Sequence, residues 1–100
     1  MFEILELLHY AEAYSLMRTG NKYIILNLSN IDYQIKEIEK CFSRKFDVDI
    51  SLGIINRLSN EGFITHIYNT IKITELGEKE YQRILMLKIN RDKKLEQILN

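Results

Sequence analysis

The chain opens with apolar residues that recur at the three- and four-residue spacing of a helix. The residues that set this spacing are Phe2, Ile4, Leu5, Leu7, Leu8, Ala11, Tyr14 and Met17. The pattern stops at Thr19-Gly20-Asn21, where Gly20 occupies the usual place of a left-handed helix cap. We therefore expect a helix over residues 2–18. Its apolar band is wider than the single stripe that a small monomer buries, so the excess predicts a partner surface.

Two more helices are expected in the middle of the chain. Residues 22–28 form an apolar run that, taken alone, fits either a strand or a buried helix. Asp32 is a good N-cap for an amphipathic helix over residues 32–42. The inner face of that helix carries Ile35, Ile38 and Phe42, and its outer face carries Lys36, Glu37 and Lys40. Asp47 is a second N-cap, for a helix through residue 60 that buries Ile54, Ile55 and Leu58 and ends at Gly62.

The last third of the chain predicts a β-hairpin followed by a helix. Residues 63–68 and 70–73 are β-branched and aromatic, with Asn69 between them. Thr74 then caps a final helix, and Glu75 lies in its first turn, where the helix dipole favours an acid. The apolar stripe of this helix contains Tyr81, Ile84, Leu85 and Ile89, and it resumes at Leu95, Ile98 and Leu99. Residues 90–94 contain no apolar residue, so we expect the helix to be exposed there.

Composition places the protein among globular proteins. The chain has 100 residues, of which 46% are apolar and 28% charged, so one domain over residues 1–100 is expected. The apolar runs are too short to predict a membrane span, and the first residues carry acids where a secretory signal would carry bases. The single cysteine, Cys41, excludes an internal disulfide and predicts a cytoplasmic protein.

The residues that carry enzyme chemistry are scattered. The chain has no nucleotide-binding loop, no Gly-x-Ser-x-Gly sequence and no paired metal-ligand motif. Cys41 has no His or Cys beside it, and His9 and His66 share no ligand spacing. We therefore expect no enzyme activity, no metal and no cofactor.

Two stretches resemble the winged-helix families of prokaryotic regulators, in particular the MarR, PadR and ArsR groups. Asn56-Arg-Leu-Ser-Asn-Glu-Gly-Phe-Ile64 resembles the end of a recognition helix entering the wing. Ile73-Thr-Glu-Leu-Gly-Glu-Lys-Glu-Tyr81 resembles the junction of the wing with the final helix. The resemblance implies a mostly α fold with a small β-hairpin. In it, residues 22–81 form the winged helix-turn-helix core, and residues 2–18 and 75–99 form additional helices for dimerisation.

The resemblance also assigns roles to the predicted elements. Residues 22–28 would be the first core helix, residues 32–42 the positioning helix and residues 48–60 the recognition helix, which enters the major groove of double-stranded DNA. The groove-facing positions would be Asp49, Ile50, Leu52, Gly53, Asn56 and Arg57. Phosphate contacts would come from Arg44 and Lys45, and wing contacts from His66 and Lys72. The dimer interface would contain Phe2, Leu5, Leu8, Ile84, Leu85 and Ile89.

Several features depart from this pattern and leave alternatives open. The net charge is zero, whereas many DNA-binding domains are basic. Asp47 and Asp49 put negative charge where phosphates would approach, and Ile50, Leu52 and Gly53 are not polar. Either the recognition helix is rotated to bury these residues, or two such helices pack together across the dimer. The second arrangement is similar to that of the centromere-binding adaptors of tubulin-type plasmid and phage partition systems.

Three functions follow from these patterns. The first is a homodimeric, sequence-specific DNA-binding protein that regulates transcription, as a repressor. The second is a partition adaptor, which binds repeated DNA sites and also a filament-forming motor protein. The third is a winged-helix module that contacts only proteins, which the neutral charge keeps open. No partner membrane is expected in any of the three.

Overall fold

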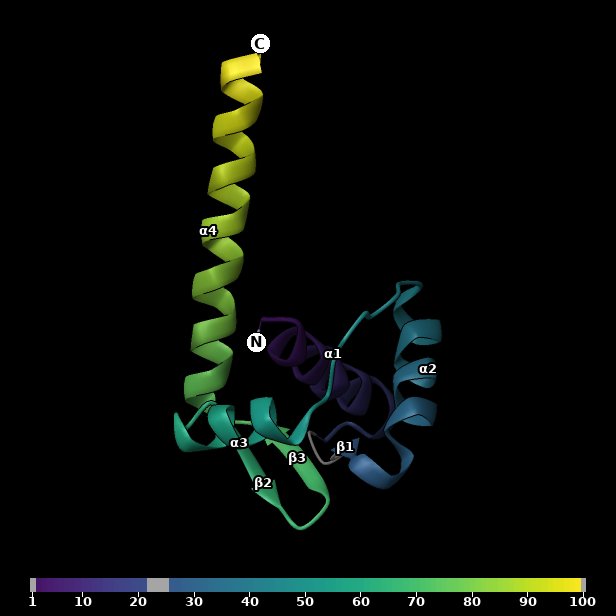
Figure 1. Cartoon of the computed structure of the whole chain (residues 1–100). Helices are drawn as coiled ribbons and strands as arrows, with labels where there is room; N and C mark the ends of the chain where they lie inside the picture. Colours follow the sequence, from purple (N-terminus) through teal and green to yellow (C-terminus); the bar gives the residue numbers. More distant parts are fainter. Residues whose placement is uncertain (1, 22–25, 100) are drawn as a thin grey trace.

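The computed structural model of the protein describes residues 2–21 and 26–99, with side chains as far as residue 92. The chain is mostly helical and contains a small three-stranded antiparallel sheet (Figure 1). Its elements are α1 (Phe2–Thr19), β1 (Leu26–Asn27), the 3-10 turn η1 (Leu28–Asn30), α2 (Ile31–Phe42), α3 (Leu52–Asn60), β2 (Ile64–Ile67), β3 (Thr70–Ile73) and α4 (Glu75–Leu99). The expected class, helix-rich with a small hairpin, is confirmed.

The sheet has the strand order β1-β3-β2, with both neighbouring pairs antiparallel. Leu26 lies opposite Ile71, and Ile64 lies opposite Ile73. The prediction of a first core helix over residues 22–28 is wrong where the structure describes that run, because Leu26–Asn27 is a strand and Leu28 begins η1. Residues 22–25 lie outside the described residues. β1 pairs with the edge of β3 that faces away from β2. This pairing gives hydrogen-bond partners to backbone N–H and C=O groups that would have none at the ends of a single helical turn.

Helix α1 lies at the centre of the fold and contacts α2, β3 and α4. Most of its wide apolar band is covered by these elements. Leu5, Leu7 and Leu8 are 0 to 2% exposed, whereas Met17 near the end of the helix is 67% exposed. The prediction that Leu5 and Leu8 belong to a dimer interface is therefore wrong, because both side chains are enclosed within one chain. The apolar surface of α1 that exceeds a single stripe packs against α2, β3 and α4 of the same chain.

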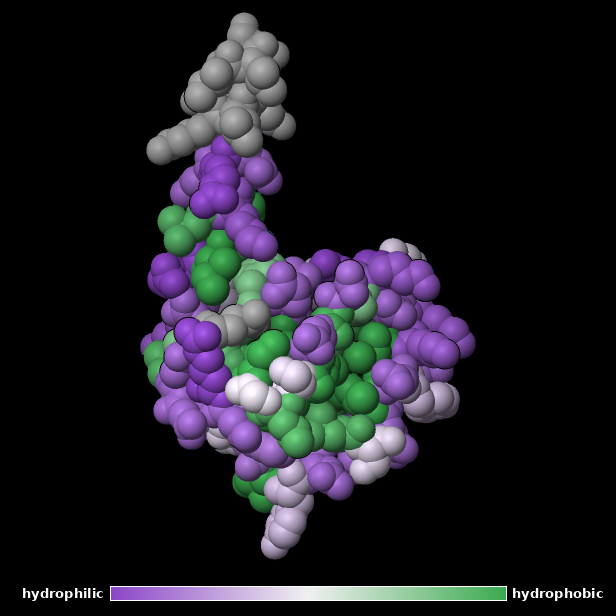
Figure 2. All heavy atoms as spheres, in the orientation of Figure 1, coloured by the Kyte–Doolittle hydropathy of each residue, from purple (hydrophilic) through white to green (hydrophobic). Residues whose placement is uncertain are grey.

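Between α2 and α3 the chain is extended rather than helical. The prediction that a helix starts at Asp47 is wrong, because Ser51 is the actual N-cap and its Oγ accepts a hydrogen bond of 3.3 Å from the backbone N–H of Ile54. Phe46, Val48 and Ile50 are half-buried against the core, while the alternate residues 45, 47 and 49 are exposed. This two-residue period is that of an extended strand lying on an apolar surface. In Figure 2, apolar side chains gather on the face where this segment crosses α1.

The hairpin forms where the sequence predicted it, but β2 is shorter than expected, because Tyr68 belongs to the turn and not to the strand. The turn is Tyr68-Asn69, with Tyr68 at a positive φ of 55°, and Gly62 takes a φ of +82° where α3 leads into β2. Thr74 caps α4, because its Oγ1 accepts a hydrogen bond of 3.0 Å from the N–H of Gly77. A Cβ at Gly77 would clash with the carbonyl oxygen of Phe63, so only glycine allows this close approach. The base of α4 is thereby locked against the end of α3.

Helix α4 has 25 residues and extends well beyond the rest of the molecule (Figure 1). Its first half packs on α1, and residues 90–92 are exposed, as the sequence predicted for that stretch. Within the described part of the chain, no helix combines the length and the apolar character that crossing a bilayer requires.

Candidate functional site

The outer face of α3 gathers the polar residues that the sequence assigned to base recognition. Asn56 and Arg57 are exposed, together with Gly53 one turn earlier. The opposite face is closed, because Ile55 and Leu58 are 1% and 0% exposed. The spacing of four between Gly53 and Arg57 keeps the exposed positions on one side of the helix. An amide and a guanidinium on one exposed helix face can each make paired hydrogen bonds to a base edge.

Arg57 remains available although it has an acidic neighbour. Its Nε lies 3.4 Å from Oε1 of Glu61, one turn further along the chain, and its side chain is 68% exposed. An exposed pair of this kind is worth little, about 0.3–0.5 kcal/mol. The guanidinium can therefore exchange Glu61 for another acceptor at small cost.

The hairpin packs beside α3 and offers a second exposed edge. β2 contacts α3 directly, Lys72 on β3 is exposed and His66 on β2 is half-buried. The tip carries two side chains that the sequence interpretation did not assign, Tyr68 at 93% exposed and Ile67 at 62%. Tyr68 lies in the two-residue turn, which places it at the tip, and Ile67 is the last residue of β2.

Arg44 has a role different from the one predicted. Its guanidinium donates to Oε1 of Glu6 on α1 at 2.9 Å and lies over the rings of Tyr10 and Phe46, at 4.6 and 4.9 Å from their centroids. The positive charge is balanced inside the chain, and the stacking fixes the connecting segment to α1. The predicted phosphate contact from Arg44 therefore has to compete with three existing partners.

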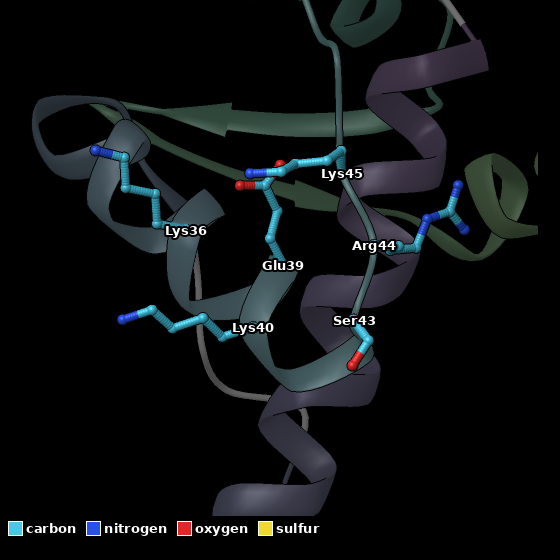
Figure 3. Close-up of a pocket in the computed structure, with 6 residues that line it drawn as sticks. All are labelled: Lys36, Glu39, Lys40, Ser43, Arg44 and Lys45. Carbon is cyan, nitrogen blue, oxygen red and sulfur yellow. The ribbon is translucent and has the colours of Figure 1, made fainter.

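Lys45 points to the other side of the connecting segment, into a hollow between that segment and α2 (Figure 3). The hollow has a volume of about 450 Å³. Its lining residues are Lys36, Glu39, Lys40, Ser43, Arg44 and Lys45. Lys36 and Lys40, on the outer face of α2, line the same hollow, and in Figure 3 their side chains point away from the connecting segment and from Lys45.

A second hollow, of about 310 Å³, is acidic. It lies between the start of α1 and the start of α3, and is lined by Glu3, Ile4, Asp47, Val48, Asp49 and Ile54. Asp49 was predicted to face the groove, together with Ile50. In the structure both lie in the connecting segment before α3, and Ile50 is half-buried against the core. The acids are thus concentrated on the approach to α3 and not on its outer face.

The residues predicted for a dimer interface fall into two groups. Phe2 is engaged within the chain, where its ring stacks on Tyr81 at 5.3 Å and lies under the ammonium of Lys88 at 3.9 Å. On α4, Ile84 and Leu85 are half-buried and Ile89 is 39% exposed. Two further apolar side chains that were not predicted, Met86 and Leu87, are each 55% exposed. Apolar side chains are visible on α4 above the body in Figure 2.

A cluster of polar side chains joins α1 to α4 beside Phe2. Nδ1 of His9 lies 2.6 Å from Oε1 of Glu78, and the His9 ring stacks on Tyr81 at 4.6 Å. Desolvation by burial, with a smaller contribution from the charge of Glu6, raises the pKa of Tyr81 to about 12. Among the described residues, no three His, Cys, Asp or Glu side chains come together in a group that could hold a metal. This cluster is therefore a link between two helices.

Comparison with known proteins found no family model, no curated protein and no solved structure that matches this chain.

Proposed function

We propose that the protein is a winged-helix, sequence-specific DNA-binding protein that acts as a homodimer and regulates transcription. The observation that carries the proposal is the exposed polar face of α3 beside an exposed hairpin tip. These lie in a chain whose elements follow the order α1, β1, α2, α3, β2, β3 around a β1-β3-β2 sheet. A helix with a polar outer face, flanked by a projecting hairpin, matches the way a recognition helix and a wing address a duplex.

In this proposal α3 enters the major groove and reads bases through Asn56 and Arg57. Asparagine pairs with the N6 and N7 edge of adenine, and arginine with the O6 and N7 edge of guanine. The hairpin follows the backbone with Lys72, while Tyr68 and Ile67 supply apolar surface at its tip. α1 takes the place of the first core helix, which is why the fold needs no helix in residues 26–28.

The homodimer would form through α4. This helix extends beyond the body of one chain and carries exposed Met86, Leu87 and Ile89. Apolar side chains on a projecting helix are removed from water when a second copy packs against them. A dimer also presents two copies of α3 to one DNA site, as paired half-sites require.

The test is DNA binding by a double variant in α3 and by a matched control. DNA fragments selected from the source genome by the wild-type protein provide the preferred site. Asn56→Ala with Arg57→Ala should weaken binding at that site by about 1–3 kcal/mol for each base contact that is removed, and should relax its sequence preference. The control, Gln82→Ala with Arg83→Ala, removes an amide and a guanidinium from the exposed side of α4 and should bind normally. Equal binding by both variants, measured by fluorescence anisotropy, would overturn the proposal.

A partition adaptor is the second candidate, and one observation favours it. Leu52 is 64% exposed at the start of α3, and a Cβ added at Gly53 would meet no atom within 4 Å. An exposed leucine beside an open glycine suits two α3 helices packed across a dimer, the geometry associated with such adaptors. Gly53→Leu should then weaken the dimer and DNA binding together. The genomic selection separates the functions too, because an adaptor recovers arrays of repeated sites and a repressor recovers single palindromes.

A further inference from the structure

The hollow between α2 and the connecting segment is basic. Four of its six lining residues are cationic. Lys36 and Lys40 are one helical turn apart on α2, and Lys45 reaches into the hollow from the connecting segment (Figure 3). The hollow is open to solvent, so a large charged partner can reach it.

The lysines of this hollow are not neutralised by the rest of the protein. Within residues 2–21 and 26–92, neither Lys36 nor Lys45 makes an ion pair, and Lys40 lies 3.9 Å from Glu37 with its side chain 78% exposed. The one acid in the hollow, Glu39, uses its Oε2 to accept a hydrogen bond of 2.8 Å from the backbone N–H of Phe46. In Figure 3 the Glu39 carboxylate and the end of Lys45 point toward each other, so this acid offsets part of the positive charge. The site thus keeps a net positive charge, while the guanidinium of Arg44 is held by Glu6.

We propose that this hollow is a second DNA-contacting surface, which binds phosphates of the duplex backbone independently of base sequence. The inference rests on the proposed DNA-binding function and extends it beyond α3 and the wing. Lysine binds phosphate as a point charge, without the paired geometry that arginine uses to read a base. The hollow presents lysines and no exposed aromatic ring on which a base could stack. It therefore contributes affinity and not specificity.

The location of the hollow fits one continuous duplex. Lys45 precedes Leu52, the first residue of α3, by seven positions, which span at most roughly 25 Å of extended chain. One turn of B-DNA is about 34–36 Å long. Lys45 therefore lies within one helical turn of B-DNA from the first residue of α3. This surface also resolves an electrostatic difficulty, because Asp47 and Asp49 oppose phosphates near α3 and the compensating charge must come from elsewhere.

The experiment compares two triple variants that remove the same charge. Lys36→Ala, Lys40→Ala and Lys45→Ala together remove the lysines of the hollow. Lys79→Ala, Arg83→Ala and Arg91→Ala remove three exposed cations from α4 and serve as the control. Each protein is titrated with the selected duplex and with a scrambled duplex over a range of salt concentrations. Replacing the three hollow lysines with arginine keeps the charge and should restore binding.

The hollow variant should bind both duplexes more weakly by the same factor. Its plot of log affinity against log salt should be flatter by about 2.7, since each phosphate that the protein no longer neutralises reduces the slope by about 0.9. The α4 variant should retain the wild-type slope. Equal slopes for the two triple variants would overturn the inference. So would binding of the wild-type protein to anionic phospholipid vesicles that disappears in the hollow variant while DNA binding is unchanged.

The outcome separates this inference from the proposed function. If the α3 variant no longer binds and the hollow variant binds normally, the DNA-binding function stands and the second surface is wrong. If the wild-type protein binds neither duplex at low salt, the proposed function fails and the inference fails with it.

Discussion

The two longest helices, α1 and α4, look alike in sequence and end in different surroundings. Both carry apolar residues over much of their circumference, and the sequence interpretation assigned both to a dimer interface. In the structure α1 is enclosed, with Leu5 at 0% exposed, whereas α4 leaves Leu87 at 55% exposed. α1 contacts three other elements, while α4 packs through its first half on α1 and then extends away from the body (Figure 1).

The difference shows that a wide apolar band on a helix predicts contacts on several sides. It does not show whether those contacts come from the same chain or from a partner. α1 meets α2, β3 and α4 of its own chain, so most of its band is buried within the fold. On α4, one face carries Glu78, Tyr81 and Lys88, which meet α1. Met86 and Leu87 lie on other sides of the helix and are exposed. α1 keeps exposed apolar side chains at its end, Leu16 and Met17, whereas α4 keeps them along its middle.

The largest effect should come from shortening a buried leucine of α1. Leu5→Ala leaves a cavity in a fully enclosed site and should lower the free energy of unfolding by about 2–5 kcal/mol. Leu87→Ala removes the same atoms from an exposed position and should cost less than about 1 kcal/mol in the monomer. Urea denaturation at concentrations below the dimer dissociation constant measures both. Similar costs for the two variants would mean that α1 and α4 do not differ as described.

A smaller effect should appear at the contact between the two helices. The pKa of Tyr81 is raised to about 12 from an ordinary value of 10, mainly because burial disfavours the phenolate. Between pH 10 and 12 the unfolded chain loses this proton first, so folding stability should fall as pH rises through that range, by about 3 kcal/mol in all. Tyr81→Phe removes this contribution. A wild-type stability profile no steeper than that of Tyr81→Phe above pH 10 would contradict the assignment.

The smallest effect should be on self-association. Leu87→Ala should weaken the homodimer roughly tenfold, because burying one leucine side chain in a dimer is worth about 1.5–3 kcal/mol and an exposed position yields only part of it. Sedimentation equilibrium measures the change. Leu16→Ala, on an exposed position of α1, should leave the dimer unchanged. A monomeric mass for the wild-type protein at micromolar concentration would contradict the proposed homodimer.

Local sequence signals succeeded where one residue determines the backbone. Gly62 takes the positive φ expected at the end of α3, and Thr74 caps α4 as expected. They failed at Asp47, because an acid is a good cap only if the residues after it turn into a helix. Phe46, Val48 and Ile50 alternate at a period of two, and this alternation was the available sign of an extended segment.

The candidate site was predicted in part. Asn56, Arg57 and Lys72 are exposed where the interpretation placed them. Arg44 was not expected to pair with Glu6, because 38 residues separate the two positions and no local pattern connects them. That Lys36 and Lys40 line the same hollow as Lys45 could not be predicted, because the hollow forms only when the connecting segment folds back beside α2.

By itself the sequence determined which segments would be helix or strand wherever the period was clear, as in α1, α2, the hairpin and α4. These features depend on residues within a few positions of one another. The predicted N-cap of α2 was wrong, because Asn30 occupies that position and Asp32 lies in the first turn. The tertiary structure alone decided that residues 26–27 would pair with β3, that α1 would be enclosed and that α4 would remain exposed. The physical reason is that hydrophobic burial depends on the apolar area removed from water and not on which part of the sequence covers it. An apolar face is satisfied by any element that covers it, and only the assembled fold shows which one does.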